Sequence, residues 1–166
     1  MTDHDHVDRV RAQWARERPD LDTQPLAVIA RLGRAARYVD QGHAEFFDRH
    51  GLSRADWDVL ASLRRQGRPY SLAPSALSRA LMRTSGAMSQ RLASLERQGL
   101  IVRRLDPADR RGIVVRLTSK GRRLVDRLGA DHLANERRLL APLTRKEQEA
   151  LAALLKRLLL AYEAEG

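Results

Sequence analysis

A change from helical to strand periodicity near residue 100 constrains the fold of this chain more than any other feature of its sequence. Two helices joined by a tight connection are predicted before it, in APSALSRAL and TSGAMSQRLASLERQGL, because apolar residues recur on one face of each segment. After it come LIVRRLD and GIVVRLT, two short β-branched segments separated by the turn-forming DPADRR. A helix–turn–helix followed by a β-hairpin with a charged tip is therefore predicted.

Three amphipathic helices are predicted on the N-terminal side of this motif. Val7, Val10 and Trp14 fall on one face of the first helix, which ends at the RPDLD segment. The second helix is expected over residues 24–50, and the third follows it directly. The expected capping and terminating residues are Thr23 and Gly51 for the second helix, and Ser53 and Gly67 for the third.

Two further helices are predicted after the hairpin, one over about residues 120–140 behind a Ser119 cap and one over residues 144–165. The last helix carries a broad apolar stripe, and a stripe of this width must be buried. The chain's own core and a second subunit are the two alternatives for covering it. The residues of the stripe are Leu151, Leu154, Leu155, Leu158, Leu159 and Tyr162.

The formal net charge of +10 favours an anionic partner such as nucleic acid. Arginine supplies most of the positive charge, and its planar guanidinium suits phosphate, although a GC-rich genome would also favour Arg codons. The position of the charge is more informative. Between residues 79 and 123 the only acidic residues are Glu96, Asp106 and Asp109, so the anionic partner is expected at the middle of the chain.

Composition excludes several other classes of protein. The chain has no cysteine, which excludes a disulfide framework and a thiolate zinc site. No apolar run approaches the roughly 20 residues of a membrane span, and the N-terminal residues lack the apolar core of a secretory signal, so a cytoplasmic location is predicted. The five His residues are scattered, and no glycine-rich phosphate loop or nucleophile elbow stands out. No catalytic, metal or cofactor site is therefore predicted.

The second helix of the motif has the properties of a helix that enters the major groove of DNA. Small residues at its N-terminus allow close approach, Gln90 can address adenine, and Arg91 can address guanine or a phosphate. The hairpin can reach the neighbouring minor groove, where Arg side chains insert favourably. The alternative is a solvated helix face and a solvated turn. The helix residues expected to contact DNA are Ser85, Ala87, Ser89, Gln90 and Arg91.

The segment from Leu77 to Leu124 resembles the DNA-binding core of the MarR family of winged-helix regulators, and the order of the flanking helices extends the resemblance to nearly the whole chain. Its most diagnostic part is DRRGIVVRLT, which fits the family's Asp-x-Arg wing pattern followed by Leu-Thr. The resemblance implies that Arg111 enters the minor groove and that Asp109 orients its guanidinium. Arg110 is expected in the same DNA-contacting wing.

The same resemblance implies the domain organisation. It predicts a single α+β, predominantly helical domain over residues 1–166, with a winged-helix lobe at about 53–118. The helices at about 7–50 and 120–164 are expected to form a symmetric homodimer on a pseudo-palindromic DNA site. Two copies related by a two-fold axis can read two half-sites, whereas one helix and one wing grip too few base pairs.

The segment QWARERPDLDTQPLAVIARLGR resembles the additional helix of the urate-responsive branch of this family. The resemblance implies that Trp14, Asp58, Arg91 and Arg103 form a ligand site. An aromatic plane can stack on a planar purine, two guanidinium groups can bind an anionic oxygen, and a carboxylate can accept a ring N–H. The alternative is that Trp14 belongs to a packing stripe and that Asp58 is the salt-bridge partner of an arginine.

These features together predict a repressor that binds double-stranded DNA as a homodimer and is released by urate or a related small aromatic anion. The alternative is a basic architectural protein that coats DNA without sequence preference and has no effector. An enzyme acting on nucleic acid would need a metal or acid–base cluster, and the sequence offers none.

Overall fold

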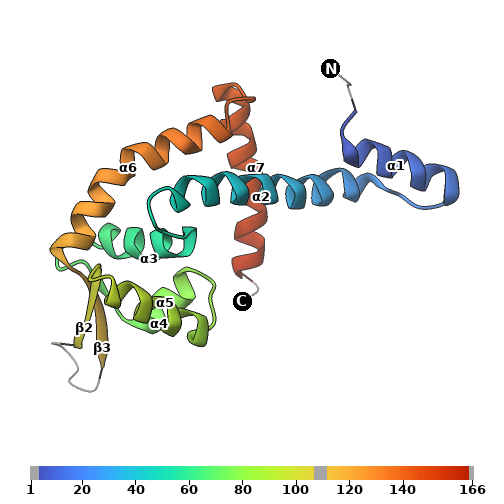
Figure 1. Cartoon of the computed structure of the whole chain (residues 1–166). Helices are drawn as coiled ribbons and strands as arrows, with labels where there is room; N and C mark the ends of the chain where they lie inside the picture. The colour runs from blue at the N-terminus through green and yellow to red at the C-terminus, as the bar shows by residue number, and fades with distance from the viewer. Residues whose placement is uncertain (1–3, 107–111, 165–166) are drawn as a thin grey trace. The chain divides into compact units, whose positions relative to one another are not determined.

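The computed structural model describes residues 4–106 and 112–164 of the chain (Figure 1). The chain divides into two compact units, Met1–Glu45 and Phe46–Gly166, and the long helix α2 passes from the first into the second. The described residues form seven helices and three strands. Their bounds are α1 (His6–Glu17), α2 (Gln24–Asp48), α3 (Arg54–Arg65), β1 (Ser71–Leu72), α4 (Pro74–Ala80), α5 (Ser85–Arg97), β2 (Ile101–Leu105), β3 (Ile113–Leu117), α6 (Ser119–Leu139) and α7 (Arg145–Ala164).

The first unit consists of α1 and most of α2, and one arginine joins them. The guanidinium of Arg31 on α2 donates to the carboxylates of Asp5 at 2.7 Å and Asp8 at 2.6 Å, the two residues that form the capping box of α1. Arg31 is the main cause that lowers the pKa of Asp5 to about 2. Because the ordinary pKa is 3.8, this ion pair stabilises the unit above that pH and is lost only as the pH falls towards 2.

The predicted cap of α2 is wrong in one detail. The carboxylate of Asp22 accepts from the Gln24 amide at 2.9 Å, whereas the Thr23 hydroxyl accepts from Nε of Arg11 at 3.4 Å. Both side chains are of the kind that caps helices, and the contact with α1 occupies the threonine. The predicted stop is confirmed, since Gly51 follows the helix with a left-handed φ of 67°.

The second unit has one hydrophobic core between the sheet, the end of α2 and helices α3 to α6. Ser53 caps α3 as predicted, and Thr84 caps α5. Figure 1 shows α4 and α5 beside the hairpin of β2 and β3, and α5 contacts β2. The large apolar residues of α3 and α5 are all buried: Trp57, Val59, Leu60, Leu63, Met88, Leu92 and Leu95.

The sheet has three antiparallel strands in the order β1-β3-β2. β2 and β3 form the predicted hairpin, in which Leu105 lies opposite Ile113, and the amide of Asp106 donates to the carbonyl of Gly112 at 2.9 Å. Strand β1 is an addition that the sequence did not predict. Two residues are too short to show an alternating pattern, and only the pairing with β3 makes them a strand.

Helix α6 is capped by Thr118 and not by Ser119, which is its first residue. The Thr118 hydroxyl accepts from the Gly121 amide at 3.0 Å and donates to the Gly99 carbonyl at 2.7 Å. The second bond reaches the glycine that follows α5. This tertiary contact selects Thr118 over its neighbour, which has the same capping chemistry.

The apolar stripe of α7 is not covered by the described part of the chain. No residue of this helix is buried, and Leu154, Leu159 and Tyr162 are each more than half exposed. The stripe is therefore not part of the hydrophobic core of the second unit. None of the described helices combines the length and apolarity that a bilayer span requires.

Candidate nucleic-acid interface

Helix α5 presents a polar edge to solvent along its first turns. Thr84 caps the helix by accepting from the Ala87 amide at 3.3 Å, while Met88 and Leu92 anchor the opposite face in the core. The first turn contains no acidic residue, so the positive end of the helix dipole is open to an anion. Four of the helix residues predicted to contact DNA are exposed on this edge: Ser85, Ala87, Ser89 and Gln90.

Arg91, the fifth of these residues, has a protein partner in the structure. Its Nη1 donates to Oγ of Ser53 at 3.0 Å and to Oδ1 of Asp56 at 3.1 Å. Asp56 is only 6% exposed and completes the capping box of α3, so its carboxylate is held in place. The bond ties α5 to the start of α3, and Arg91 cannot keep it while reaching a base edge.

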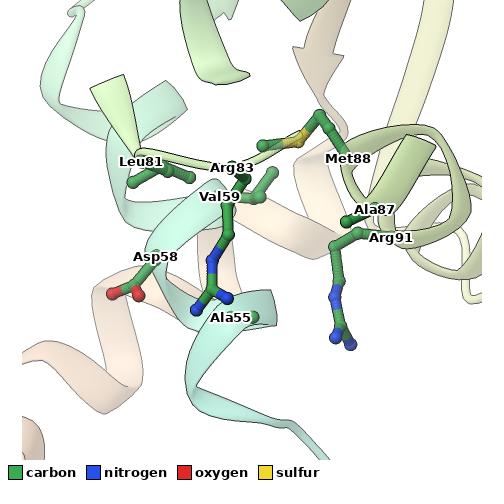
Figure 2. A pocket seen from close by; sticks show the side chains of 8 residues that line it. All are labelled: Ala55, Asp58, Val59, Leu81, Arg83, Ala87, Met88 and Arg91. Atoms are coloured by element: carbon green, nitrogen blue, oxygen red, sulfur yellow. The ribbon is translucent and has the colours of Figure 1, made fainter. Parts of the chain in front are cut away.

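A small pocket lies beside this bond, between α3 and α5 (Figure 2). It brings together Asp58 and Arg91, two residues of the predicted ligand set, and adds Arg83 from the turn before α5. In Figure 2 the Arg83 side chain extends between those of Asp58 and Arg91. The remaining lining residues are Ala55, Val59, Leu81, Ala87 and Met88. Sequence reasoning missed Arg83 because an arginine in a turn belongs to no periodic pattern.

The pocket is too small for most ligands as it stands. Its volume is about 60 Å³, whereas small-molecule sites usually measure roughly 300–1,000 Å³. Asp58 lies 3.9 Å from Arg54 one helical turn earlier, which supports the alternative that it is a salt-bridge partner. Both side chains of that pair are partly exposed, so the pair is weak and the carboxylate remains accessible.

Arg103 and Trp14 have other surroundings. Glu96 on α5 accepts from the Arg103 amide at 2.9 Å, and its second oxygen lies 3.3 Å from the Arg103 Nε. That Nε is shielded from water, and its approach to Glu96 lacks hydrogen-bond geometry, so a better aligned acceptor would be favourable. Trp14 lies on α1 in the first unit, where it is 43% exposed. The roles of both residues therefore stay predictions.

The predicted wing residues Asp109, Arg110 and Arg111 lie outside the described residues. Their roles stay predictions as well. Over residues 4–106 and 112–164, no group of three His, Asp or Glu side chains is arranged to hold a metal ion.

Comparison with known proteins shows sequence similarity over most of the chain. A sequence model of the MarR family matches residues 50–112. The HTH-type transcriptional regulator PecS of Dickeya dadantii is 37% identical over 151 residues, which is 91% of this chain and 91% of that protein. The similarity to PecS therefore reaches well beyond the helix–turn–helix and the hairpin.

Two solved structures share the fold. A mutant of MarR from E. coli complexed with operator DNA has a TM-score of 0.71 and 26% identity, covering 84% of this chain and 99% of that chain. BpsR of Bordetella bronchiseptica has a TM-score of 0.71 and 25% identity, covering 79% of this chain and 91% of that chain. Its structure comes from a study of how 6-hydroxynicotinic acid regulates its DNA binding. The predicted fold class, α+β and predominantly helical with a winged helix-turn-helix, is confirmed.

Proposed function

The chain belongs to the MarR family of transcriptional regulators, and on that premise we propose that it is a homodimeric repressor which a small anionic ligand releases from a pseudo-palindromic operator. The observation that carries the proposal is the exposed polar edge of α5 beside the hairpin, in a fold shared with a MarR structure that contains operator DNA. Residues at about 53–118 would form the winged-helix lobe, and those at about 7–50 and 120–164 the dimer.

A competition experiment separates this function from an architectural one. A palindromic fragment of a target promoter competes against bulk DNA at physiological salt. Specific regulators typically bind their site roughly 10³–10⁷ times more tightly than bulk DNA. For a protein that coats DNA without sequence preference, the ratio of the two affinities is near unity. A ratio near unity for every palindrome tested would overturn the repressor proposal.

We propose that Arg111 of the wing contacts the minor groove. Arg111→Ala is expected to weaken operator binding by about 1–3 kcal/mol and to leave the fold intact, and Asp109→Ala to act in the same direction more mildly. The measurement is operator affinity by fluorescence anisotropy at several salt concentrations. Arg137→Ala on α6 removes the same charge from another exposed arginine and serves as the control. Undiminished affinity in both wing variants would refute the wing assignment.

The ligand proposal rests on the pocket beside the bond between Arg91 and Asp56. Arg83 and Arg91 supply two guanidinium groups that can bind an anionic oxygen, and Asp58 supplies an acceptor. A ligand larger than the pocket of about 60 Å³ must move one of these side chains to enter. Moving Arg91 would break its bond to Asp56, which links α5 to α3, so occupancy and the position of the DNA-reading helix would be coupled.

Urate or a related planar anion is the proposed ligand, bound by Asp58, Arg91 and Arg103 with Trp14 stacked on its ring. BpsR, whose DNA binding is regulated by an aromatic acid, supports the chemical class. Titration of the complex between the protein and its operator with urate tests the proposal directly. No change in operator affinity at millimolar urate or xanthine would refute the ligand assignment and leave the DNA-binding proposal standing.

Arg103→Ala is expected to retain operator binding and to lose the response to urate. A charge-assisted hydrogen bond contributes about 1.5–3 kcal/mol, so the urate concentration for half-release should rise roughly tenfold or more. The neighbouring exposed Arg104 provides the control, since Arg104→Ala makes the same change one position along the strand. Equal urate responses in the two variants would remove Arg103 from the ligand site.

A further inference from the structure

A second hollow of about 270 Å³ lies where the loop before β1, strand β3 and the start of α6 meet. None of its described lining residues is shared with the pocket in Figure 2. Three arginines from three different segments line it: Arg68 from the loop, Arg116 from β3 and Arg122 from α6. The described lining contains no carboxylate. Tyr70 and the first residues of α6 complete the lining.

The positive charge of this hollow is not neutralised by the described protein. Arg64, which lies over the Tyr70 ring, pairs with Asp126 at 2.7 Å. By contrast, Arg68, Arg116 and Arg122 form no salt bridge with any described residue. Like charges that converge in one concave site repel one another and raise the local affinity for anions.

One donor in the hollow is also left without an acceptor. The Nε–H of Arg122 is shielded from water and has no hydrogen-bond partner among the described residues. A buried polar group of this kind is costly and uncommon in folded proteins. Because water does not reach this nitrogen, the Arg122 side chain has to turn before a bound anion can accept from it. Such a turn would add one more donor to the charge of the three arginines.

Tyr70 fixes the loop that carries Arg68 against strand β3. Its amide donates to the Gly67 carbonyl at 2.6 Å, and its own carbonyl accepts from the Leu117 amide at 3.1 Å, which fastens the loop to the end of β3. Its φ of 61° is left-handed, a conformation that costs free energy in a residue with a side chain. The Arg122 guanidinium near the phenol is the main cause that lowers the Tyr70 pKa, with smaller contributions from Arg64 and Arg68.

From this convergence we infer that the hollow binds a small phosphate-bearing anion, either inorganic phosphate or a phosphate monoester. A single carboxylate is satisfied by one bidentate arginine, whereas a tetrahedral phosphate accepts from several directions. The N-terminus of the 21-residue helix α6 adds its partial positive charge and backbone N–H groups on the same side.

The position of the hollow favours a small molecule over a phosphate of the DNA backbone. Arg116 pairs with Ser71 and Val102, towards the base of the hairpin. Leu105 and Ile113 form the pair nearest the tip, and β3 runs from there to α6 (Figure 1). With a rise of about 3.3 Å per residue, Arg116 lies three residues, or roughly 10 Å, from that end of the hairpin. The hollow is therefore set back from the tip that is proposed to contact DNA.

The test uses the full-length protein and inorganic phosphate, with chloride holding the ionic strength constant. We expect saturable binding of one phosphate per chain by calorimetry, together with a rise in melting temperature. Arg116→Ala and Arg68→Ala are expected to weaken this binding about tenfold or more. Arg137→Ala is the control and should bind phosphate as the wild type does. A monoester such as glycerol phosphate forms a second arm, and tighter binding than inorganic phosphate would identify an organic ligand.

Ionisation of Tyr70 supplies a second readout. Bound phosphate neutralises the surrounding arginines, so the phenol of Tyr70 should titrate at higher pH when phosphate is present. The titration is followed by absorbance, and Tyr70→Phe should remove the shift. Equal phosphate binding by Arg116→Ala and Arg137→Ala would overturn the inference. So would a loss of operator affinity in Arg116→Ala without phosphate, since that result would assign the hollow to the DNA backbone. Neither outcome bears on the urate response, which is tested by Arg103.

Discussion

A double variant, Leu155→Glu with Leu158→Glu, is expected to be a monomer that no longer binds the operator, although neither residue belongs to the DNA-reading helix. No residue of α7 is buried by the described part of the chain, and in the proposed homodimer a second subunit covers the stripe. Burying one leucine contributes about 1.5–3 kcal/mol, and about 1.4 kcal/mol changes an equilibrium tenfold. Losing two such contacts from each subunit, and placing carboxylates there instead, should abolish dimerisation at micromolar concentration.

Sedimentation velocity and binding to whole and half operator sites measure this effect. Ala153→Glu is the control, because 3.6 residues per turn place it on the opposite side of α7 from Leu155 and Leu158, and it adds one of the two carboxylates that the double variant adds. We expect the control to remain dimeric and to bind the whole site. A wild-type monomer that binds a palindrome tightly would refute the dimer proposal.

Replacing Gly121 with alanine is expected to destabilise the second unit more than any other single methyl group added to α6. A Cβ at this position would lie 2.1 Å from the carbonyl oxygen of Leu100 and 3.1 Å from Cδ2 of Leu117. The oxygen belongs to the backbone and cannot rotate away, so the start of α6 must move off the hairpin base. Overpacking of a core costs about 1–3 kcal/mol, and we expect Gly121→Ala at or above the upper end of that range.

Chemical denaturation of the full-length protein measures the change in unfolding free energy. Gly129→Ala in the same helix is the control, since a Cβ there meets no atom within 4 Å. Alanine is favoured over glycine within helices by about 0.5–1 kcal/mol, so this control should be as stable as the wild type or more so. Equal stability of the two variants would show that the contact with Leu100 is not restrictive.

The order of the helices and of the two hairpin strands is determined by the sequence itself, because it depends on short-range chemistry. Ser53 and Thr84 cap their helices by accepting from amides only three residues along the chain. Gly67 and Gly99 adopt φ values of 70° and 68°, which glycine tolerates best. Apolar periodicity then identifies the buried faces of α3 and α5, and the resemblance to the MarR family follows from the same local segments.

The partners of the charged side chains are decided by the tertiary structure alone. Arg91 meets Asp56, 35 residues away, because α5 packs against α3, and no spacing along the chain encodes that meeting. The same holds for β1, which exists only through its pairing with β3, and for the convergence of Arg68, Arg116 and Arg122. A long arginine side chain has many rotamers of similar energy, and the acceptor it finds depends on which elements lie against its own. The sequence therefore determines which residue types are available at each surface, whereas packing determines which of them are paired and which remain open to a ligand.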